Sequence, residues 1–381
     1  MEKSEVSNVT LHASYLKIST MRIVFISLSM LCCLSLQAGD SLRYKIAQML
    51  IVGFRGMELT SDSHIYGDIK KLHVGGVILF DYDAASKTRR RNITSPAQLK
   101  RLCRDLQNLA GETLIISIDQ EGGMVNRLKA SAGFPATVSA KYLGALNNAD
   151  STQRYAAQTA RLLKELGFNF NFVPCVDIDI NPKCPVIGKV ERSFSVKPEV
   201  VVSHSRIWID EHRRKNIITS PKHFPGHGSS RSDSHLGFTD VTGTWTKKEL
   251  IPYRRLLKSG HCDAIMVSHV FNKNLDSRYP ATLSQKIVGM IRDDLNFDGL
   301  VVSDDMAMGA IVDSYSFEAA LELAINAGID MLVLSNNGKY YDDQMAQKAV
   351  DAIHAAVKEK RISEERINEA YRRVNAIKSR L

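Results

Sequence analysis

The segment 222–235 holds the densest group of side chains in the sequence that can do chemistry. Its fourteen positions include three histidines, two cationic side chains and one aspartate: His223, His227, His235, Lys222, Arg231 and Asp233. A histidine that titrates near neutrality can both donate and accept a proton, and Asp233 is close enough in sequence to orient His235 and raise its basicity. Two glycines let the backbone bend, and the apolar pair Ile217-Ile218 precedes the segment. We therefore expect a functional loop that follows a buried strand.

Eight short apolar runs, each followed by a longer amphipathic stretch, are expected to position these groups. Because the runs are continuously apolar rather than alternating, they predict strands buried on both faces, and hence a parallel sheet. The runs are Gln48–Phe54, Gly76–Phe80, Leu114–Ile118, Phe168–Val173, Ile217–Ser220, Ala264–Ser268, Leu300–Ser303 and Met331–Leu334. Helical spacing is found in Pro96–Ala110, Ser151–Leu166, Lys197–Lys215, Lys247–Ser259 and Phe317–Ala327. Ser284 is the predicted N-cap of a further helix over Gln285–Leu295.

Eight β–α units predict an α/β fold, namely a single closed (β/α)8 barrel of the TIM type. A doubly wound open sheet is the alternative, but no GxGxxG phosphate fingerprint follows the first strand. The length in excess of the ~250 residues typical of the barrel lies in loops, notably 81–95, 175–196 and 221–245. No Pro- or Ser-rich linker divides residues 39–381, so we expect one catalytic barrel there, with Ser363–Leu381 as an additional C-terminal helix.

Polar groups gather at the predicted carboxyl ends of the strands, where such barrels carry their active sites. The third strand ends in Asp119-Gln120-Glu121-Gly122-Gly123, the fifth in Lys222-His223, the sixth in His269 and the seventh in Asp304-Asp305. A single strand-end Asp is often only a helix cap. Several such groups that face one barrel mouth predict a catalytic pocket.

Three kinds of protein use such a set of side chains. A glycosidase needs a carboxylate nucleophile and a proton donor across the scissile bond. A zinc hydrolase needs converging His and Asp ligands, but His223 and His227 flank Pro225 and Gly226 and so do not share a helical face as an HExxH pair does. A non-catalytic sugar-binding barrel needs only the hydrogen-bonding groups.

Four motifs, in this order, resemble glycoside hydrolase family 3, specifically its β-N-acetylhexosaminidase branch. They are Asp-Gln-Glu-Gly-Gly at 119–123, Glu-Arg-Ser-Phe-Ser at 191–195, Lys-His-Phe-Pro-Gly-His-Gly with Asp-Ser-His within 222–235, and Ser-Asp-Asp-Met at 303–306. The resemblance runs from about residue 43 to the C-terminus, and its most specific part is the long signature within 222–235. It implies a retaining exo-glycosidase that needs no metal and no organic cofactor.

The resemblance assigns catalytic roles to three residues. Asp304 is expected to be the nucleophile that attacks the anomeric carbon, because an ionised carboxylate suits an oxocarbenium-like transition state. The acid/base of this branch is a histidine, which maps onto His235, with Asp233 as its partner. Asp305 is expected to be a cap or a supporting hydrogen-bond acceptor.

Substrate-binding roles carry over to Asp119, Arg127, Arg192, Lys222 and His223. The carboxylate is expected to accept hydrogen bonds from sugar hydroxyls, and the cations to donate them. His227 is expected to be structural and to bond the loop backbone, while His269 and Met306 lie either in the pocket or in the core. The family usually has Arg after the Gly-Gly pair, where this chain has Met124. That departure removes a charge near the sugar site and leaves the substrate preference open.

The composition is that of a soluble globular protein, with 381 residues, 44% hydrophobic, 24% charged and a net charge of +9. A basic balance favours an anionic partner such as a cell-wall polymer. Because no helix-turn-helix or stacked-aromatic signature accompanies it, we expect no nucleic-acid binding. The expected partner is a carbohydrate ending in N-acetylglucosamine, and the expected state is a monomer.

A targeting segment is expected near the N-terminus. Met21-Arg22 precedes the apolar run Ile23–Leu36, which is the pattern of a secretory signal peptide and is short for a membrane span. We expect cleavage after Ala38 and a periplasmic or secreted protein with no membrane span after processing, residues 1–20 being an upstream extension. An uncleaved anchor is the alternative, and lipidation at Cys32 is disfavoured because no small residue precedes it.

The mature chain then keeps four cysteines: Cys103, Cys175, Cys184 and Cys262. None of them forms a CxxC pair, so neither a zinc ribbon nor a redox motif is expected. Free buried thiols are the expected state, and pairing of Cys175 with Cys184 is the alternative in an oxidising compartment.

The prediction is a retaining exo-β-N-acetylhexosaminidase that removes terminal β-linked N-acetylglucosamine from peptidoglycan fragments or chitooligosaccharides. A β-glucosidase and a phosphate-dependent phosphorylase are alternatives within the class, since a histidine that has given up its proton is uncharged and repels phosphate less than a carboxylate does. A non-catalytic sugar-binding barrel and a zinc hydrolase are the alternatives outside it.

Overall fold

The computed structural model describes residues 41–381, and the compact unit Lys45–Leu381 carries the fold. The expected signal segment, its cleavage point after Ala38 and the upstream extension lie outside the described residues. Within the described part of the chain, no helix is long and apolar enough to cross a bilayer.

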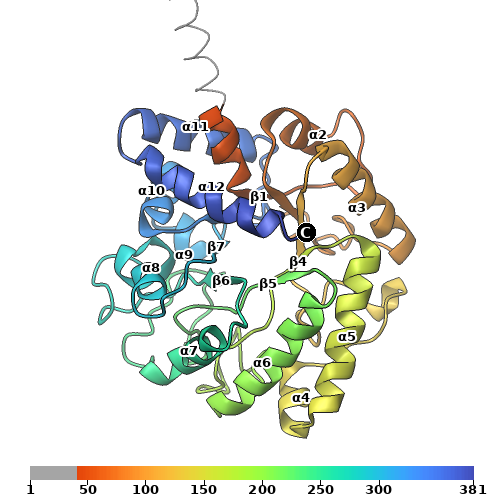
Figure 1. The fold of residues 1–381 in the computed structure, drawn as a ribbon, viewed down its shortest axis with the longest axis vertical. Coiled ribbons are helices and arrows are strands. Elements are labelled where there is room, and N and C mark those ends of the chain that lie inside the picture. The colour runs from red at the N-terminus through yellow and green to blue at the C-terminus, as the bar shows by residue number, and fades with distance from the viewer. Residues whose placement is uncertain (1–40) are drawn as a thin grey trace, which may run out of the picture. The chain divides into compact units, whose positions relative to one another are not determined.

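Eight parallel strands form the sheet at the centre of this unit (Figure 1). In chain order they are β1 (Leu50–Gly53), β2 (Gly76–Ile78), β3 (Ile115–Ile118), β4 (Phe170–Asn171), β5 (Ile218–Thr219), β6 (Ala264–Val267), β7 (Leu300–Asp305) and β8 (Met331–Leu334). The order of pairing is β5-β4-β3-β2-β1-β8-β7-β6, so β1 pairs with both β2 and β8. Each strand lies on one of the eight predicted apolar runs, and the predicted (β/α)8 architecture is confirmed.

The first residues of the segment 222–235 close the barrel between β5 and β6. Pro221 follows β5 and has no N–H, so it cannot extend a regular ladder. Instead, the N–H of Phe224 donates to the carbonyl of Met266 over 2.9 Å, and the N–H of Met266 donates to the carbonyl of Pro221 over 3.1 Å. The histidine-rich segment therefore begins as part of the barrel wall, held by main-chain hydrogen bonds.

Helices connect and surround the strands. Those that follow β1 are α2 (His64–Gly67), α3 (Pro96–Ala110), α4 (Ala140–Leu146), α5 (Ala149–Leu166), α6 (Pro198–Arg213), α7 (Ile251–Lys258), α8 (Gln285–Arg292), α9 (Gly309–Val312), α10 (Phe317–Ala327), α11 (Met345–Lys358) and α12 (Glu364–Lys378). The helices α3 and α10 have the predicted bounds. Ser284 caps α8 as predicted, because its Oγ accepts the N–H of Ile287 over 3.1 Å. The helix α7 begins later than predicted, since Lys247–Leu250 forms a 3₁₀ turn.

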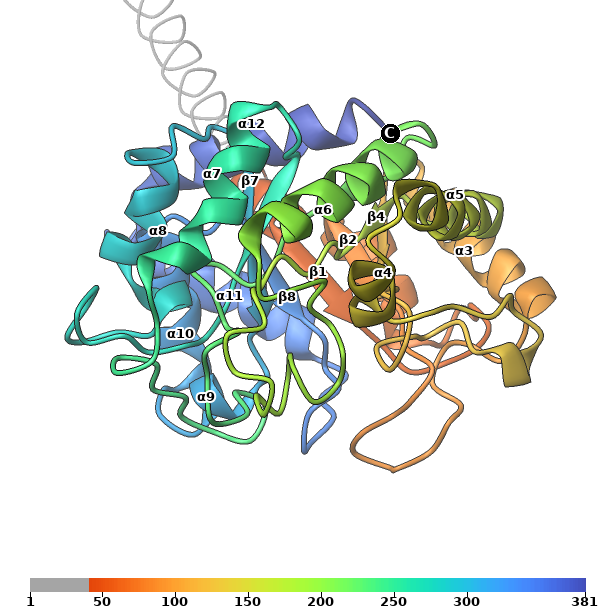
Figure 2. The ribbon, with the colours of Figure 1, turned by 90° about the horizontal axis from the view of Figure 1, so that it is seen from below.

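The predicted additional C-terminal helix is α12, and it covers one end of the barrel. Val374 and Ile377 belong to a buried cluster that also contains Ile51, Phe170 and Met331 from the strands. In Figure 2, α12 lies at one edge of the strands, and the long connections between strands and helices gather at the other. One barrel end is thus sealed by apolar packing, which leaves the loop end for a site.

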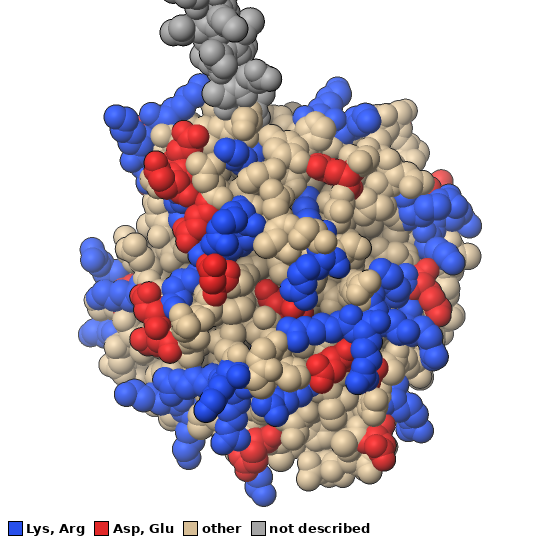
Figure 3. All heavy atoms as spheres, viewed as in Figure 1, with Lys and Arg blue, Asp and Glu red and all other residues tan. Residues whose placement is uncertain are grey.

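The face that carries α12 mixes charges of both signs (Figure 3). Arg372 and Arg373 of α12 both pair with Asp298, and Arg366 pairs with Glu369. Acidic groups therefore interrupt the basic surface on this face.

The four cysteines among the described residues are free thiols, and Cys103, Cys175 and Cys184 are buried. The expectation of free buried thiols is confirmed for these three. Cys262 is a free thiol as expected, but it is only partly buried, so the prediction that it is buried is wrong.

Candidate active site

The strand β7 brings two adjacent carboxylates to the barrel mouth. Asp305 is fully engaged, because it accepts the hydroxyl of Ser335 over 2.5 Å and the N–H groups of Ser335 and Ala307 over 3.0 and 3.1 Å. Asp304 accepts the N–H of Asp305 at Oδ1 over 2.8 Å. No hydrogen bond from the described part of the chain reaches Oδ2 of Asp304. The pair therefore consists of one carboxylate that supports the backbone and one that keeps an oxygen available.

The surroundings of Asp304 favour its ionised form. Burial works against ionisation, but the electrostatic interactions with His223, His269 and His235 and the hydrogen bond from the N–H of Asp305 outweigh it and hold the pKa of the Asp304 carboxyl well below its usual range. Burial raises the pKa of the neighbouring Asp305 instead, against the hydrogen bonds it accepts. The pKa values of these two adjacent carboxyl groups are therefore shifted in opposite directions, and Asp304 is the one that can act as an anion.

His235 lines the same pocket as Asp304 and is oriented by Asp233. Oδ1 of Asp233 lies 2.7 Å from Nδ1 of His235 and accepts the backbone N–H of that residue over 2.8 Å. The loop is fastened to the start of α9, since the N–H groups of Gly309 and Ala310 donate to the carbonyls of His235 and Ser234, each over 3.1 Å. Burial lowers the pKa of His235, but the hydrogen bond to Asp233 and the charges of Asp304 and Asp233 outweigh it and raise the pKa above 6.5.

A buried lysine joins two carboxylates beneath the pocket. Nζ of Lys222 lies 2.7 Å from Oδ1 of Asp119 and 2.8 Å from Oε1 of Glu121, and the Lys222 side chain is 2% exposed. Arg192 binds Glu121 with two parallel hydrogen bonds of 2.7 and 2.9 Å. Burial opposes the charged forms, but the ion pairs outweigh it, so the pKa of Asp119 is lowered and that of Lys222 is raised. All four groups therefore carry charge at neutral pH.

His223 lies between a guanidinium and a carboxylate. Nη2 of Arg192 lies 2.9 Å from its Nε2, and Oδ2 of Asp177 lies 2.6 Å from its Nδ1. A guanidinium only donates, so Nε2 accepts and the ring proton is on Nδ1, which donates to Asp177. Oδ1 of Asp177 also accepts the N–H of His227 over 2.7 Å. The His223 ring is thereby fixed from both sides.

The five residues expected to bind substrate form two layers. Asp119 and Arg127 line the pocket together with His235 and Asp304. The guanidinium of Arg127 lies over the ring of Phe80 at 5.3 Å, and its Nη2 is 3.7 Å from Oδ2 of Asp119. The other three (Arg192, Lys222 and His223) lie behind this lining and are linked to it by the contacts described above. Lys222 holds the Asp119 carboxylate in place and favours its ionised form, and Arg192 and His223 support this contact through Glu121.

The glycines of the histidine-rich segment are required by close packing. A Cβ at Gly228 would lie 1.8 Å from the carbonyl oxygen of Ile178, and Gly226 has a φ of +128°, which favours glycine. His227 between them is structural, as expected, but its ring does not bond the backbone. Its nitrogens lie 2.9 and 3.0 Å from the hydroxyls of Ser230 and Ser234, and burial lowers its pKa to about 4.

One group of side chains has the composition of a metal site but is already engaged. Cys175, Asp177 and His223 are buried and bring their ligand atoms within 4.8 Å of one another. Both oxygens of Asp177 and both ring nitrogens of His223 are used in the hydrogen bonds to Arg192, His223 and His227. Burial also raises the pKa of the Cys175 thiol well above its usual value. A metal ion would have to break the contacts that orient His223.

Residues from several of the motifs, far apart in the sequence, thus lie together at one end of the barrel. Known proteins share this sequence pattern and this fold. The model of the "Glycosyl hydrolase family 3 N terminal domain" matches residues 41–377. The chain belongs to glycosyl hydrolase family 3. The expectation of a family 3 glycoside hydrolase is therefore confirmed.

Curated relatives of this chain include proteins named β-hexosaminidase. That of Tolumonas auensis is 32% identical over 295 residues, which is 76% of this chain and 83% of that protein. That of Alkalilimnicola ehrlichii is 33% identical over 298 residues, which is 76% of this chain and 80% of that protein.

Solved structures of family 3 proteins share the fold. A glycoside hydrolase family 3 β-N-acetylglucosaminidase from Paenibacillus sp. has a TM-score of 0.80 and 34% identity, over 89% of this chain and 62% of that chain. A β-N-acetylhexosaminidase from Beutenbergia cavernae has a TM-score of 0.77 and 26% identity, over 89% of this chain and 98% of that chain. This chain thus spans less than two thirds of the Paenibacillus chain and nearly all of the Beutenbergia chain.

Glu121 and Asp177 stand at the centre of the buried network, although Glu121 had no role predicted from the sequence and Asp177 was not singled out. Each follows a strand, β3 or β4, so the rule that sites gather at strand ends would have found them. His269 and Met306 are in the core, being 1% and 3% exposed. Met124 is 66% exposed and does not line the pocket, so the departure from the family pattern lies outside the pocket wall.

Proposed function

We propose that this protein is a retaining exo-β-N-acetylhexosaminidase with Asp304 as nucleophile and His235 as acid/base. Both residues line one pocket, and this observation carries the proposal. Their surroundings favour opposite charges, since the pKa of Asp304 is held low and that of His235 is raised. Near neutral pH this gives an anion and a proton donor side by side. A retaining glycosidase needs that combination.

In the first step, Asp304 attacks the anomeric carbon as the bond to the leaving oxygen breaks. Oδ1 of Asp304 is held by the N–H of Asp305, so Oδ2 is the oxygen that forms the glycosyl ester. His235 donates the proton on Nε2 to the leaving oxygen, because Nδ1 is bonded to Asp233. The Asp233 carboxylate stabilises the imidazolium before that transfer and fixes the tautomer that remains after it.

In the second step, water displaces Asp304 from the anomeric carbon. His235, now neutral, takes a proton from that water through Nε2 as the new bond to oxygen forms. The ester bond breaks, Asp304 leaves as a carboxylate, and the imidazolium is restored. Two displacements at one carbon return the β configuration.

Asp119 and Arg127 are proposed to hold the hydroxyls of the terminal sugar. Asp119 can accept and Arg127 can donate, and Lys222 fixes the Asp119 carboxylate from behind over 2.7 Å. The curated relatives named β-hexosaminidase support an N-acetylhexosamine as that sugar. Peptidoglycan fragments or chitooligosaccharides are the proposed natural sources.

We also propose that the protein acts in the periplasm or outside the cell, which rests on the apolar run Ile23–Leu36 behind Met21-Arg22. Fractionation of cells that express the full chain tests this. Recovery of a processed form beginning at Gly39 in the extracytoplasmic fraction is expected, and full-length protein confined to the cytosol contradicts it.

The substrate assignment is tested with 4-nitrophenyl N-acetyl-β-D-glucosaminide beside the corresponding β-glucoside, each with and without phosphate. We expect release from the acetamido substrate only, at a rate that phosphate does not raise. Preference for the glucoside, or phosphate-dependent formation of a sugar phosphate, would replace the proposal with one of the alternatives within the class. Binding without turnover would favour a sugar-binding barrel.

A further inference from the structure

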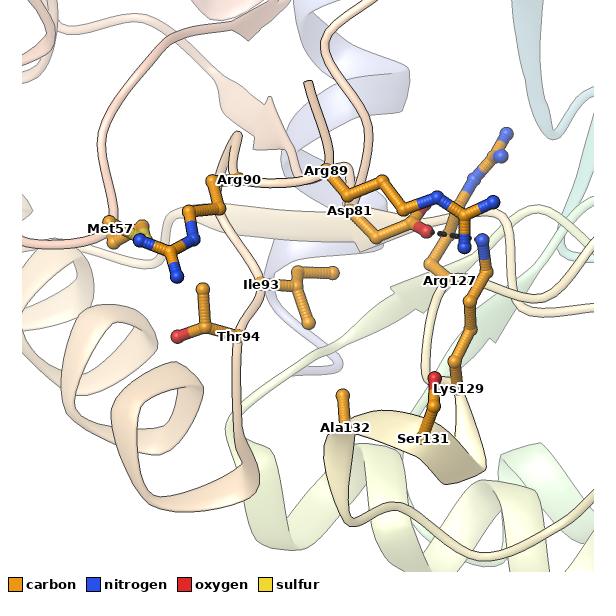
Figure 4. A pocket seen from close by; sticks show the side chains of 10 residues that line it. All are labelled: Met57, Asp81, Arg89, Arg90, Ile93, Thr94, Arg127, Lys129, Ser131 and Ala132. Atoms are coloured by element: carbon orange, nitrogen blue, oxygen red, sulfur yellow. Dashed lines mark ion pairs between the residues drawn. The ribbon is translucent and has the colours of Figure 1, made fainter. Parts of the chain in front are cut away.

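A second pocket adjoins the active site and is strongly basic. Its charged lining residues are Asp81, Arg89, Arg90, Arg127 and Lys129. Arg127 also lines the active-site pocket, so the two pockets share one wall. In Figure 4 the side chains of Arg89, Arg127 and Lys129 come together around Asp81, while Arg90 extends away toward Met57.

The cations of this pocket exceed the acidic groups that could neutralise them. Lys129 pairs with Asp81 over 2.8 Å, and Arg127 lies 3.7 Å from Asp119. The side chains of Arg89 and Arg90 make no ion pair or hydrogen bond with any residue that the structure describes. Nε of Arg127 is buried and has no hydrogen-bond partner among the same residues. Donors therefore remain for a ligand that brings acceptors with negative charge.

The position of the pocket relative to the catalytic pair follows from the strand order. Asp81 lies soon after β2, and Arg127 follows β3, whereas Asp304 is the last but one residue of β7. In the order β3-β2-β1-β8-β7, the strand that precedes Arg127 is four places away from the strand that carries Asp304, which is half of an eight-stranded barrel. His235 is fastened to α9, which follows β7. The basic pocket therefore lies across the barrel mouth from the groups that act on the scissile bond.

A sugar bound between these two sides has its anomeric carbon at Asp304 and the rest of its ring toward Arg127. A substituent on the far side of the terminal ring would extend past Arg127 into the basic pocket, whereas the leaving group extends from the anomeric carbon at His235. An anion placed beside Arg89 and Lys129 would gain charge-assisted hydrogen bonds, which are stronger than neutral ones.

We propose that the basic pocket binds an anionic substituent carried by the terminal N-acetylhexosamine itself, either a sulfate or phosphate ester or a carboxylate. This inference rests on the proposed function, because it takes Asp304 and His235 to mark the anomeric carbon. It extends the substrate class from neutral to acidic terminal amino sugars. Arg89 and Lys129 are its specificity-determining residues, and neither contacts the catalytic pair.

Binding of monosaccharides tests the pocket without any need for turnover. Isothermal titration calorimetry on the whole protein compares N-acetylglucosamine, its 6-sulfate and N-acetylmuramic acid, whose carboxylate is carried on O3. We expect at least one acidic sugar to bind more tightly than the neutral one. Arg89→Gln and Lys129→Gln should each reduce that preference about tenfold or more, the usual effect of losing one hydrogen bond to a charged group. Which acidic sugar responds identifies the position of the anion.

The matched control is Arg101→Gln, which removes the same charge from an exposed position of α3 outside the pocket. We expect it to leave the preference unchanged. An equal loss in Arg101→Gln and Arg89→Gln would overturn the proposal, because it would mean that only the overall charge matters. The absence of any preference for either acidic sugar in the unmodified protein would overturn it as well.

Kinetics separate this inference from the proposed function. The substrates are 4-nitrophenyl N-acetyl-β-D-glucosaminide and its 6-O-sulfo derivative. If calorimetry shows that the pocket binds the 6-sulfate, we expect the ratio of kcat/KM for the sulfated over the neutral substrate to fall in Arg89→Gln, as the binding preference does. Failure to hydrolyse either substrate would refute the proposed function, and calorimetry would still decide the pocket. An Arg89→Gln effect confined to a 3-carboxyumbelliferyl leaving group would place the anion on the other side of the scissile bond and contradict the inference.

Discussion

Oδ1 of Asp233 lies 2.7 Å from Nδ1 of His235 and leaves Nε2 as the ring nitrogen open to the pocket. The same oxygen accepts the backbone N–H of His235 over 2.8 Å, so one carboxylate fixes both the ring and the loop that carries it. Because this carboxylate is negative, it also raises the pKa of the imidazole. Asp233 thus contributes both to the basicity of His235, the proposed proton donor, and to the orientation of its ring.

Replacement of Asp233 by Asn is expected to shift the pH dependence of the first chemical step. That step needs protonated His235, so kcat/KM falls as the pH rises through the raised pKa of the imidazole. Removal of the negative charge lowers that pKa, and the alkaline limb should move to lower pH, with a larger loss of activity at pH 8 than at pH 6. The pH profile of kcat/KM measures it. Asp240→Asn, at an exposed position of the same loop, is the matched control, and an alkaline limb that stays in place in Asp233→Asn would contradict the assignment.

The adjacent carboxylates of β7 should respond differently to the same substitution. Asp304→Asn should lower kcat by a factor of about 10³ or more, because an amide is a poor nucleophile and carries no charge for the transition state. Asp305→Asn keeps an acceptor for the N–H groups of Ser335 and Ala307, so we expect activity within about tenfold of the unmodified enzyme. Steady-state rates of the two purified variants measure the contrast. Equal losses would contradict the assignment of different roles, and a larger loss in Asp305→Asn would make Asp305 the nucleophile.

Lys222 should be essential to stability as well as to the site. Its replacement by Met leaves Asp119 without its close cation and Glu121 with only Arg192, and breaking a buried ion pair in this way costs about 3–5 kcal/mol. Urea unfolding at pH 7 measures the loss. The double variant Lys222→Met/Asp119→Asn should recover part of it, because one of the stranded charges is gone. A single variant as stable as the unmodified protein would contradict the buried network, and Lys100→Met at an exposed position controls for the substitution itself.

Glu249 should make stability depend on pH. It is buried beside Gly228, whose N–H donates to its Oε2 over 3.1 Å, and burial raises its pKa to about 7. The folded protein holds this proton more tightly than the unfolded chain, whose glutamate titrates near 4.5, so the stabilisation is fully present below pH 4.5 and is lost as the pH rises through about 7. The loss amounts to about 3 kcal/mol.

Glu249→Gln removes this titration, so the variant should be more stable than the unmodified protein at pH 8 and should gain this advantage between pH 4.5 and 7. Chemical unfolding at a series of pH values measures the difference between the two proteins. Asp68, whose pKa is also raised to about 7 by burial, contributes equally to both and cancels. A difference that does not change with pH would mean that Glu249 is ionised in the fold like an ordinary glutamate.

The barrel was predictable from the sequence because its strands are buried on both faces, which leaves continuous apolar runs such as Leu114–Ile118 and Met331–Leu334. The closed barrel was predicted too, but not the contacts that close it, because these are single hydrogen bonds between Phe224, Met266 and Pro221 rather than a periodic run of residues. The start of α7 was missed for a related reason. A 3₁₀ turn over Lys247–Leu250 and an α-helix have similar side-chain patterns over one turn.

The proposed catalytic pair, Asp304 and His235, could be named from the sequence because both residues lie in long motifs, whereas the groups that position the pair depend on contacts between distant segments. The bonds of Arg192 to Glu121 and to His223 join three loops, and no spacing in the sequence encodes such a contact. The basic pocket was missed likewise, since Arg89 and Lys129 are unremarkable surface residues until the loops after β2 and β3 bring them together.

Labelling with a mechanism-based inactivator tests directly whether Asp304 is the nucleophile. Incubation with 5-fluoro-N-acetyl-β-D-glucosaminyl fluoride traps a glycosyl-enzyme if the nucleophile is a protein carboxylate, and mass spectrometry of peptides locates the sugar. We predict one label per chain, on Asp304, with loss of activity in proportion to labelling. A label on another carboxylate, or continued turnover without any covalent adduct, would contradict it.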